Sequence, residues 1–560
     1  MKKMIDCATN KEIIGNRFSN ISLWHYLGTT PDERLFHEWA EKMPLNWLKD
    51  NYPWIEEIQL FIATGGSYLG HRRSSGDSDI SEFNRDLFKD PSDRSVTDDY
   101  DFTPLVRACR NILNQGVKPL IKLHGVPIKY SSEPQIDWFR VNIRPPDDYQ
   151  VFADYITALI TALIEAFGDE EVLKWRWFIG TEMENGTWWK AYDGTGDSSR
   201  DEFCKLYDWT LFAMEKVLGV GTFEVGSHAM MTGESTGGIW DPADFISHCE
   251  EGTNYATGKK GSRMTMFAIS YYDKCPTELE GISSNLSPSA DLSLFEAQVA
   301  RTRNVLDKRG FLDVPIEVSE GGFCFGSDGK WLWHGLSVGG MFDASWTALS
   351  FFKMLQSEVS LWSRWSYLRT SGLFHGLENA STHALRMISS MQDDNLIQLT
   401  EEGKELSFLC SYHQEQKIIR VLLVHHAPDM EKRGTDMEYN LTLKNTPFTK
   451  EVDIEEINLK ELEGDFWPLW IEDKTHFGLE KDDFIYSEDQ SDVLHALKIT
   501  AHKELWKTLS EKYILSSQFP EATVRREEIK GGSISLKGSL PCFSLKLLQI
   551  RQTKEITHER

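Results

Sequence analysis

The chain has 560 residues, a formal net charge of −26 at pH 7 and an aromatic content of 12%. This length exceeds what one compact core fills, so we expect two or three domains. A surface this acidic repels phosphate backbones and anionic lipid, which argues against nucleic acid or a membrane as a partner. We also expect no membrane span, because an apolar run of about 18 residues is not evident.

The first 15 residues have a basic start but no apolar core, so they do not predict a signal peptide. We therefore expect a cytoplasmic protein, or a secreted or periplasmic one whose leader has been removed. A homo-oligomer is compatible with this composition. The eight cysteines are scattered and form no C-x-x-C pair, which predicts buried free thiols. The 19 tryptophans are numerous enough to include residues that stack on sugars.

Strand-like and helix-like segments alternate between about residues 17 and 390. Strands are expected in FSNISLWHY (18–26), IEEIQLFIAT (55–64), VKPLIKLHG (117–125), WRWFIG (175–180), GTFEVGS (221–227), MTMFAISYY (264–272), VPIEVSE (314–320) and VSLWSRWSY (359–367). Most of them are separated by amphipathic helical segments. Eight such βα units predict a (β/α)8 TIM barrel over residues 17–394, with a doubly wound open sheet as the alternative.

The pattern changes at residue 395, where short alternating strands separated by turns replace the βα units. This pattern predicts a C-terminal antiparallel β-sandwich over residues 395–560, with one helical insert at 491–513. We expect the N-terminal segment, residues 1–16, to pack on this sandwich.

Acidic side chains end two of the predicted barrel strands, where a barrel places its catalytic groups. Glu182 and Glu184 follow the fourth strand, and Glu320 ends the seventh. Cleavage of a glycosidic bond requires one carboxylic acid to protonate the leaving oxygen and a second carboxylate to attack or stabilise the anomeric carbon. Two acids across a mouth rich in Trp and Tyr therefore predict glycoside hydrolysis.

Several segments carry motifs at matching barrel positions. WRWFIGTEMEN (175–185) resembles W-x-F-x-x-W-N-E-P-N of glycoside hydrolase family 39, VPIEVSEGG (314–322) resembles that family's P-I-x-x-T-E, and VKPLIKLHGVP (117–127) resembles its K-P-x-x-x-x-G-x-x-P. LWSRWSY, GLFHGL and ALRMISSM, within 361–391, resemble the segment that closes the family's barrel. The resemblance extends over most of residues 17–395, and the sandwich also fits.

The resemblance implies retaining hydrolysis of β-xylosides, α-iduronides or related sugars, with no metal or other cofactor. By position, Glu182 matches the family's acid/base and Glu320 its nucleophile. We expect Glu182 to hold a proton and Glu320 to stay ionised. The expected substrate is a plant- or microbe-derived glycoside, a xyloside or arabinoside being favoured.

The sequence departs from the family pattern at positions that bear on sugar choice. Thr181 replaces the Asn that contacts the sugar's 2-hydroxyl, and Glu184 replaces a second Asn. An acidic pair after the eighth strand is missing, since SYLRTSGLF (366–374) stands in its place. The candidates for substrate contact are His124, Thr181, Glu184, Asn185, Tyr271, Tyr272, Trp188, Trp189 and Trp365.

Some of these candidates have a simpler structural role as their alternative. Only one of Tyr271 and Tyr272 can face inward, and each tryptophan could belong to the core. Glu317 is expected on the opposite strand face from Glu320, because three residues separate them. Two other functions remain open, a non-catalytic carbohydrate-binding protein on an inherited barrel and an inverting hydrolase that uses Glu184.

Overall fold

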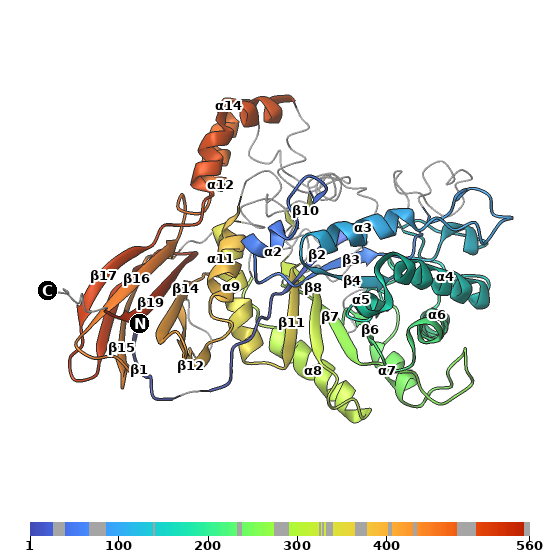
Figure 1. The fold of residues 1–560 in the computed structure, drawn as a ribbon, viewed down its shortest axis with the longest axis horizontal. Helices are drawn as coiled ribbons and strands as arrows, with labels where there is room; N and C mark the ends of the chain where they lie inside the picture. The colour runs from blue at the N-terminus through green and yellow to red at the C-terminus, as the bar shows by residue number, and fades with distance from the viewer. Residues whose placement is uncertain are drawn as a thin grey trace.

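The computed structural model shows a barrel joined to a β-sandwich (Figure 1). It describes residues 1–9, 11–25, 40–66, 86–137, 141–231, 238–273, 290–323, 326–327, 330–331, 340–364, 378–400, 406–428, 434–478 and 500–553.

Eight parallel strands close into the barrel in the order β11-β2-β3-β4-β5-β6-β7-β8. They are β2 (Asn20–His25), β3 (Glu57–Ile62), β4 (Lys118–Leu123), β5 (Arg176–Ile179), β6 (Glu224–Ala229), β7 (Met266–Asp273), β8 (Ile316–Phe323) and β11 (Val359–Arg364). Because β11 pairs in parallel with both β2 and β8, the sheet has no open edge. The predicted TIM barrel is confirmed and the open sheet is excluded.

Helices surround this barrel. They are α2 (Trp47–Asn51), α3 (Thr103–Asn114), α4 (Tyr149–Phe167), α5 (Asp169–Val172), α6 (Gly196–Leu218), α7 (Pro242–Glu251), α8 (Phe295–Lys308), α9 (Met341–Leu355) and α11 (Ala380–Ser389), with the short 3-10 helix η1 (Ile128–Tyr130). Local sequence sets several boundaries. Asp148 caps α4 by accepting from the amides of Gln150 and Val151, and Gly168, with φ of 84°, ends the helix.

One described helix, α4, is long and apolar enough by length and composition to cross a bilayer. No such segment was expected from the sequence. Its buried face, which includes Tyr155, Ile156 and Leu159, packs in the core between barrel and helices. The need to fill this core accounts for the apolar character of α4.

The barrel interior is filled in layers by side chains of alternating strand positions. At the N-terminal end Arg176 lies between two carboxylates: its Nη2 is 2.7 Å from Glu57 Oε2, and its Nη1 pairs with Glu317. The next layer is an apolar cluster of Leu120, Phe178, Met266 and Ala268. All three charged groups of the lowest layer are therefore paired and largely buried.

A β-bulge in β8 alters which of its side chains face inward. Val318 pairs with Ile269 but Glu320 pairs with Ser270, so Ser319 is an extra residue on this strand. The register with β11 shifts at the same place. The bulge turns Glu320 into the barrel although Glu317 already faces inward. The prediction that strand alternation separates these two glutamates was therefore wrong.

The C-terminal part consists of two packed sheets (Figure 1). The larger has the order β12-β13-β14-β19-β16-β17, and the smaller has the order β1-β15-β18. Their strands are β1 (Lys2–Asp6), β12 (Asn395–Leu399), β13 (Leu406–His413), β14 (Ile418–His425), β15 (Met437–Lys444), β16 (Glu451–Leu459), β17 (Thr523–Glu528), β18 (Ile534–Leu540) and β19 (Ser544–Gln552). The first strand of the chain, β1, pairs in parallel with β15, so the N-terminus joins the smaller sheet.

The central strands of the larger sheet are buried on both faces. On one face Leu423 and Leu548 pack against the smaller sheet, and on the other Leu422 and Leu547 join the barrel core. Two helices, α12 (Trp467–His476) and α14 (Thr500–Ser516), extend from this part and pack together through Trp470. One insert was predicted at 491–513; residues 500–513 lie in α14, and 491–499 lie outside the described residues. A short hairpin, β9 (Gly326–Ser327) with β10 (Lys330–Trp331), belongs to neither sheet.

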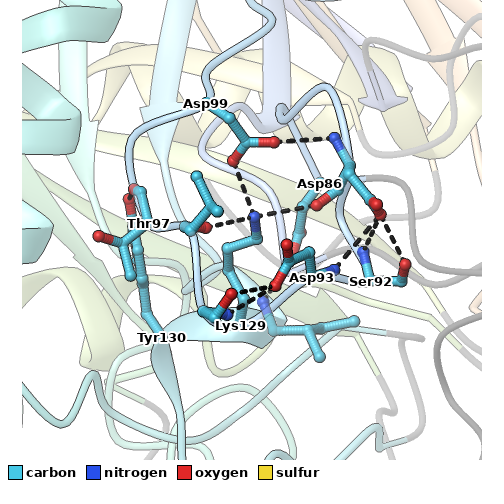
Figure 2. Close-up of polar contacts among 11 residues, drawn as sticks. Asp86, Ser92, Asp93, Thr97, Asp99, Lys129 and Tyr130 are labelled. Atoms are coloured by element: carbon cyan, nitrogen blue, oxygen red, sulfur yellow. Dashed lines mark hydrogen bonds and ion pairs between the residues drawn. The ribbon is translucent and has the colours of Figure 1, made fainter.

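A buried lysine organises the loop between β3 and α3 (Figure 2). Lys129 Nζ donates to the carbonyls of Asp90 and Val96, at 3.0 and 2.8 Å, and to Asp99 Oδ1 at 2.9 Å. Asp86, from the same loop, accepts from the amide of Gly66 after β3 and from that of Ile128 after β4. The cluster therefore ties together the loops after two neighbouring strands.

The charged layer around Arg176 provides a stability test. Replacement Arg176→Met should lower the free energy of unfolding by about 3–5 kcal/mol at pH 7, because two buried carboxylates lose their cation. Denaturant unfolding at pH 7 measures this loss, which should shrink at acidic pH because burial raises the pKa of Glu317 and lets it take up a proton. The triple variant Glu57→Gln, Arg176→Met, Glu317→Gln should recover most of it; equal stability of wild type and Arg176→Met would contradict the expectation.

Candidate active site

Glu182 stands on a tight turn that follows β5. Gly180 has φ of 83°, and a Cβ there would lie 2.6 Å from the ring of Phe203, so glycine is needed. Glu182 itself has φ of 40°, which is unusual for a residue with a side chain. The turn is fixed by the amide of Met183, which donates to the carbonyl of His228 on β6 at 3.0 Å. Such backbone strain is characteristic of functional positions.

Three donors hold the Glu182 carboxyl group. Asn185 Nδ2 and Trp188 Nε1 donate to Oε2, at 2.8 and 3.1 Å. Ser270 Oγ, from β7, donates to Oε1 at 2.6 Å. Hydrogen bonds of this kind favour an ionised carboxylate.

Glu320 faces Glu182 from β8. Its Oε1 accepts from the hydroxyl of Tyr272 at 2.6 Å, and its Oε2 is buried with no hydrogen-bond partner among the described residues. One oxygen each of Glu182 and Glu320 lie within 4.8 Å of one another. Both residues are buried, with 6% of each exposed.

This pair retains a proton well above the usual range of a glutamate. Burial first, then the charge of Glu182, raise the pKa of Glu320 to about 8, against the opposing effects of Lys122 and Tyr272. The hydrogen bonds agree, because Glu182 has three donors and Glu320 has one. These surroundings favour the proton of the pair on Glu320. This is the reverse of the predicted state, in which Glu182 was protonated and Glu320 ionised.

A buried chain of polar side chains lies beneath the pair. Lys122 Nζ is 2.8 Å from His228 Nδ1, and His228 Nε2 is 2.8 Å from Ser270 Oγ, which continues to Glu182. Burial lowers the pKa of Lys122 to about 7, although the charges of Glu320 and Glu182 raise it. Burial and the charge of Lys122 lower the pKa of His228 well below its usual value, so this imidazole is neutral.

Glu182, His228 and Glu320 also offer three possible metal-ligand atoms within 4.8 Å of one another. Both imidazole nitrogens of His228 are already hydrogen-bonded, to Lys122 and to Ser270. A cationic ammonium beside the third ligand disfavours a metal ion at this place. The arrangement suits proton chemistry better than metal binding.

Glu184 lies beside the pair but does not face Glu320. Its Oε1 accepts from the amide of Met231 at 2.9 Å, and its Oε2 has no partner among the described residues. Burial raises the pKa of Glu184 to about 8, with a smaller contribution from the charge of Glu182. The charge of Glu182, and not that of Glu184, contributes to the pKa of Glu320. Glu182 is therefore the acid opposite Glu320.

Two further candidates present buried polar atoms without partners in the part of the chain that the structure describes. They are Thr181 Oγ1 and His124 Nε2. Burial and the charge of Lys122 lower the pKa of His124 to about 3, so its ring is neutral and able to donate to or accept from a sugar hydroxyl. The ring of His124 meets that of Trp188 edge-on at 5.1 Å.

The structure gives the two tyrosines at the end of β7 different roles. Tyr272 faces inward to Glu320, whereas Tyr271 donates to Asp273 and packs on Phe295 and Trp362 outside the barrel. Of the two tyrosines, Tyr272 is therefore the one that faces into the barrel, and Tyr271 faces outward.

The predicted sugar-stacking role does not fit either described tryptophan. Trp189 is 2% exposed, belongs to the main core and donates to the carbonyl of Ser199, so it has no free ring face. Trp188 is 1% exposed and donates to Glu182, as Asn185 does, so both support the acid. Trp365, the third candidate, lies outside the described residues.

Sequence reasoning missed Lys122 and Ser270. Both occupy inward positions of their strands, Lys122 two residues before His124 and Ser270 two residues before Tyr272. A lysine at an inward position of a barrel strand was the available signal, because an unpaired cation is rarely buried there.

A closed barrel with two facing carboxylates at its mouth has the arrangement of the barrel glycoside hydrolases. Residues 83–328 match the family model of glycosyl hydrolases family 39. The resemblance to glycoside hydrolase family 39 that the sequence motifs predicted is thus confirmed over these residues.

A β-xylosidase from Geobacillus stearothermophilus is 29% identical over 153 residues, which are 27% of this chain and 28% of that protein. The sequence match thus spans less than a third of this curated relative. A monomeric β-xylosidase from Caulobacter crescentus CB15 matches in structure with a TM-score of 0.65 at 13% identity, covering 99% of this chain and 100% of the other. A family 39 enzyme from Xanthomonas axonopodis pv. citri gives a TM-score of 0.64 at 13% identity, over 99% and 97%. At such identity these structures confirm the fold alone.

The raised pKa of Glu320 predicts a pH-dependent stability. Between its usual value of 4.5 and about 8, the folded protein keeps a proton that the unfolded chain releases, so stability falls as pH rises through this window. Replacement Glu320→Gln removes this effect and should raise the unfolding temperature relative to wild type more at pH 8 than at pH 5, by a few degrees. Thermal unfolding at both pH values measures it, with Glu165→Gln on the exposed side of α4 as control. A difference that is equal at both pH values would contradict the assignment.

Proposed function

We propose that the protein is a retaining glycoside hydrolase that cleaves a xyloside or arabinoside by double displacement. The observation that carries the proposal is the separation of Glu182 and Glu320, whose oxygens lie within 4.8 Å of one another. Retaining enzymes place their carboxyl groups about 5–5.5 Å apart, whereas inverting enzymes leave roughly 6.5–9.5 Å for a water molecule. An inverting reaction through Glu184 has less support, because Glu184 accepts from the amide of Met231 and its charge does not contribute to the pKa of Glu320.

Each carboxyl group has the surroundings that its role requires. Tyr272 holds Glu320 Oε1 and leaves Oε2 without a partner among the described residues, so Oε2 is the atom that attacks the anomeric carbon. Glu182 protonates the leaving oxygen in the first step. In the second step the same group, now ionised, removes a proton from the water that releases the sugar from Glu320.

The first step requires the pair's proton on Glu182, although the surroundings favour it on Glu320. The bound sugar supplies the reason for the change. Positive charge develops at the anomeric carbon next to Glu320 and favours its ionised form, while the leaving oxygen gains negative charge beside Glu182 and favours protonation there.

The substrate class rests on the relatives and on residues near the pair. Two proteins described as β-xylosidases resemble this chain, one by sequence and one by fold. Thr181 Oγ1, His124 Nε2 and Glu184 Oε2 are buried polar atoms without protein partners in the described part, and they are suited to bind sugar hydroxyls. Because Thr181 is shorter than the Asn of the family motif, we propose that the contact with the 2-hydroxyl is weaker or is made by a neighbour.

A non-catalytic carbohydrate-binding protein is the alternative function. Such a protein does not need two buried carboxyl groups that repel one another, since this repulsion lowers stability. The retention of both Glu182 and Glu320 in hydrogen-bonded positions therefore supports catalysis.

The two glutamates should respond differently to removal. Glu320→Ala should abolish turnover of every glycoside, because no covalent intermediate forms. Glu182→Ala should lower the rate about 100-fold or more on substrates with poor leaving groups. On aryl glycosides it should lower the rate of the first step much less, because their leaving groups need little protonation to depart. Steady-state rates on aryl and alkyl xylosides and arabinosides measure both effects.

Azide is the matched test of the acid/base role. With Glu182→Ala it should restore the second step on an aryl glycoside and give a glycosyl azide of retained configuration. Inverted azide product, or full activity of Glu320→Ala, would reject the assigned roles.

The shared proton also sets a pH limit. As pH rises through about 8, the pair loses the one proton that the first step requires. We therefore expect kcat/KM to fall above about pH 8 for poor leaving groups, and the fall should be weaker for activated aryl glycosides. Rates on the two substrate types across pH 5–10 test this; a fall beginning near pH 6 would contradict it.

A further inference from the structure

We propose that Lys122 acts through His228 and Ser270 to orient Glu182 and to hold it as the ionised general base of the second step. This inference rests on the proposed function and names three positioning residues for it. All three side chains are buried: 0% of Lys122, 0% of His228 and 2% of Ser270 are exposed.

The three side chains come from β4, β6 and β7 and form one unbroken line. The distances are 2.8 Å from Lys122 Nζ to His228 Nδ1, 2.8 Å from His228 Nε2 to Ser270 Oγ, and 2.6 Å from Ser270 Oγ to Glu182 Oε1. A lysine ammonium can only donate, so His228 Nδ1 accepts and its Nε2 carries the hydrogen. Ser270 then accepts from His228 and donates to Glu182. Every donor in the line points toward the carboxylate.

This direction matters for the two steps of a double displacement. In the first step Glu182 carries a proton, and in the second it must be ionised to take one from water. Once Glu320 is esterified, its charge no longer acts on Glu182. The hydroxyl of Ser270, which donates to Glu182 Oε1, and the positive charge of Lys122 behind it then favour the ionised form of Glu182. We expect Glu182 to stay ionised to a lower pH for this reason.

Lys122 is placed to supply that cation. The titratable groups that surround it are His124 on its own strand, His228 on β6, Glu182 after β5 and Glu320 on β8. Its Nζ also lies 3.7 Å from the centre of the Phe61 ring, which favours the charged form. Glu182 and Glu320 raise the pKa of Lys122 and burial lowers it to about 7, so its charge responds to the charge of the pair.

The experiment compares Lys122→Gln, Ser270→Ala and Ser270→Thr with wild type. Gln keeps an N–H donor but removes the charge, Ala breaks the line, and Thr keeps the hydroxyl. The matched control is Lys129→Gln, which removes another buried lysine from the loop cluster of Figure 2, outside the line to Glu182.

On an aryl glycoside whose second step limits kcat, the acidic limb of the kcat profile reports the ionisation of Glu182. We expect Lys122→Gln to move this limb upward by roughly one pH unit, and also the alkaline limb of kcat/KM, because the positive charge that lowers the pKa of Glu320 and favours ionised carboxylates near it is gone. Ser270→Ala should move the acidic limb in the same direction, and Ser270→Thr should restore most of it. The control should leave both limbs in place.

A purely structural role gives a different result, since it lowers the rate at all pH values without moving either limb. Unmoved limbs in Lys122→Gln, or a control that shifts as much, would overturn the proposal. If wild type turns over none of the glycosides, the proposed function fails. The charge effect is then read by ¹³C NMR titration of glutamate carboxyls, assigned with Glu182→Gln and Glu320→Gln. The midpoint near pH 8 should move upward in Lys122→Gln, and an unchanged midpoint would overturn the inference without reference to turnover.

Discussion

The repulsion between two buried carboxyl groups is the constraint on which the rest of the site depends. Glu182 and Glu320 approach within 4.8 Å in a place where each is 6% exposed. In such surroundings both cannot be ionised at low cost, so they keep one proton between them. In the proposed double displacement the pair would hold its proton on either side, because each half of that reaction needs a different charge on Glu182.

Two irregularities of the backbone bring the pair together. A regular β8 would place Glu317 inward and Glu320 on the outer face, and the bulge at Ser319 corrects this without removing Glu317 from its ion pair with Arg176. On the other side, the turn at Gly180 and the positive φ of Glu182 carry the second acid across the mouth. Neither irregularity is a low-energy choice, and both persist because the closed barrel fixes the strands on either side.

The fold could be predicted from sequence because it depends on periodic patterns. All eight barrel strands overlap the predicted segments, since inward and outward side chains repeat at fixed spacing and helices separate them, although β6, β7 and β8 run one to three residues beyond the predicted ends. Glu182 and Glu320 were found because acids at strand ends are conspicuous. Three features were not predicted: the bulge of β8, the inward orientation of Glu317, and the line from Lys122 through Ser270. They depend on the register between strands that are distant in sequence. Trp189 was predicted to stack on a sugar because it follows the candidate acids in sequence, yet packing decides a tryptophan's exposure, here against Phe203.

The two buried cations of the barrel show how position determines what a charge does. Arg176 at the lower end is matched by Glu57 and Glu317 through direct contacts, so its charge is fixed and serves stability. Lys122 has no carboxylate within direct contact in the described residues and reaches Glu182 only through His228 and Ser270. A charge held at this distance cannot neutralise the pair outright. In the proposed mechanism it shifts the balance between protonated and ionised forms, and a pair that alternates between both forms needs such an adjustable partner more than a fixed one.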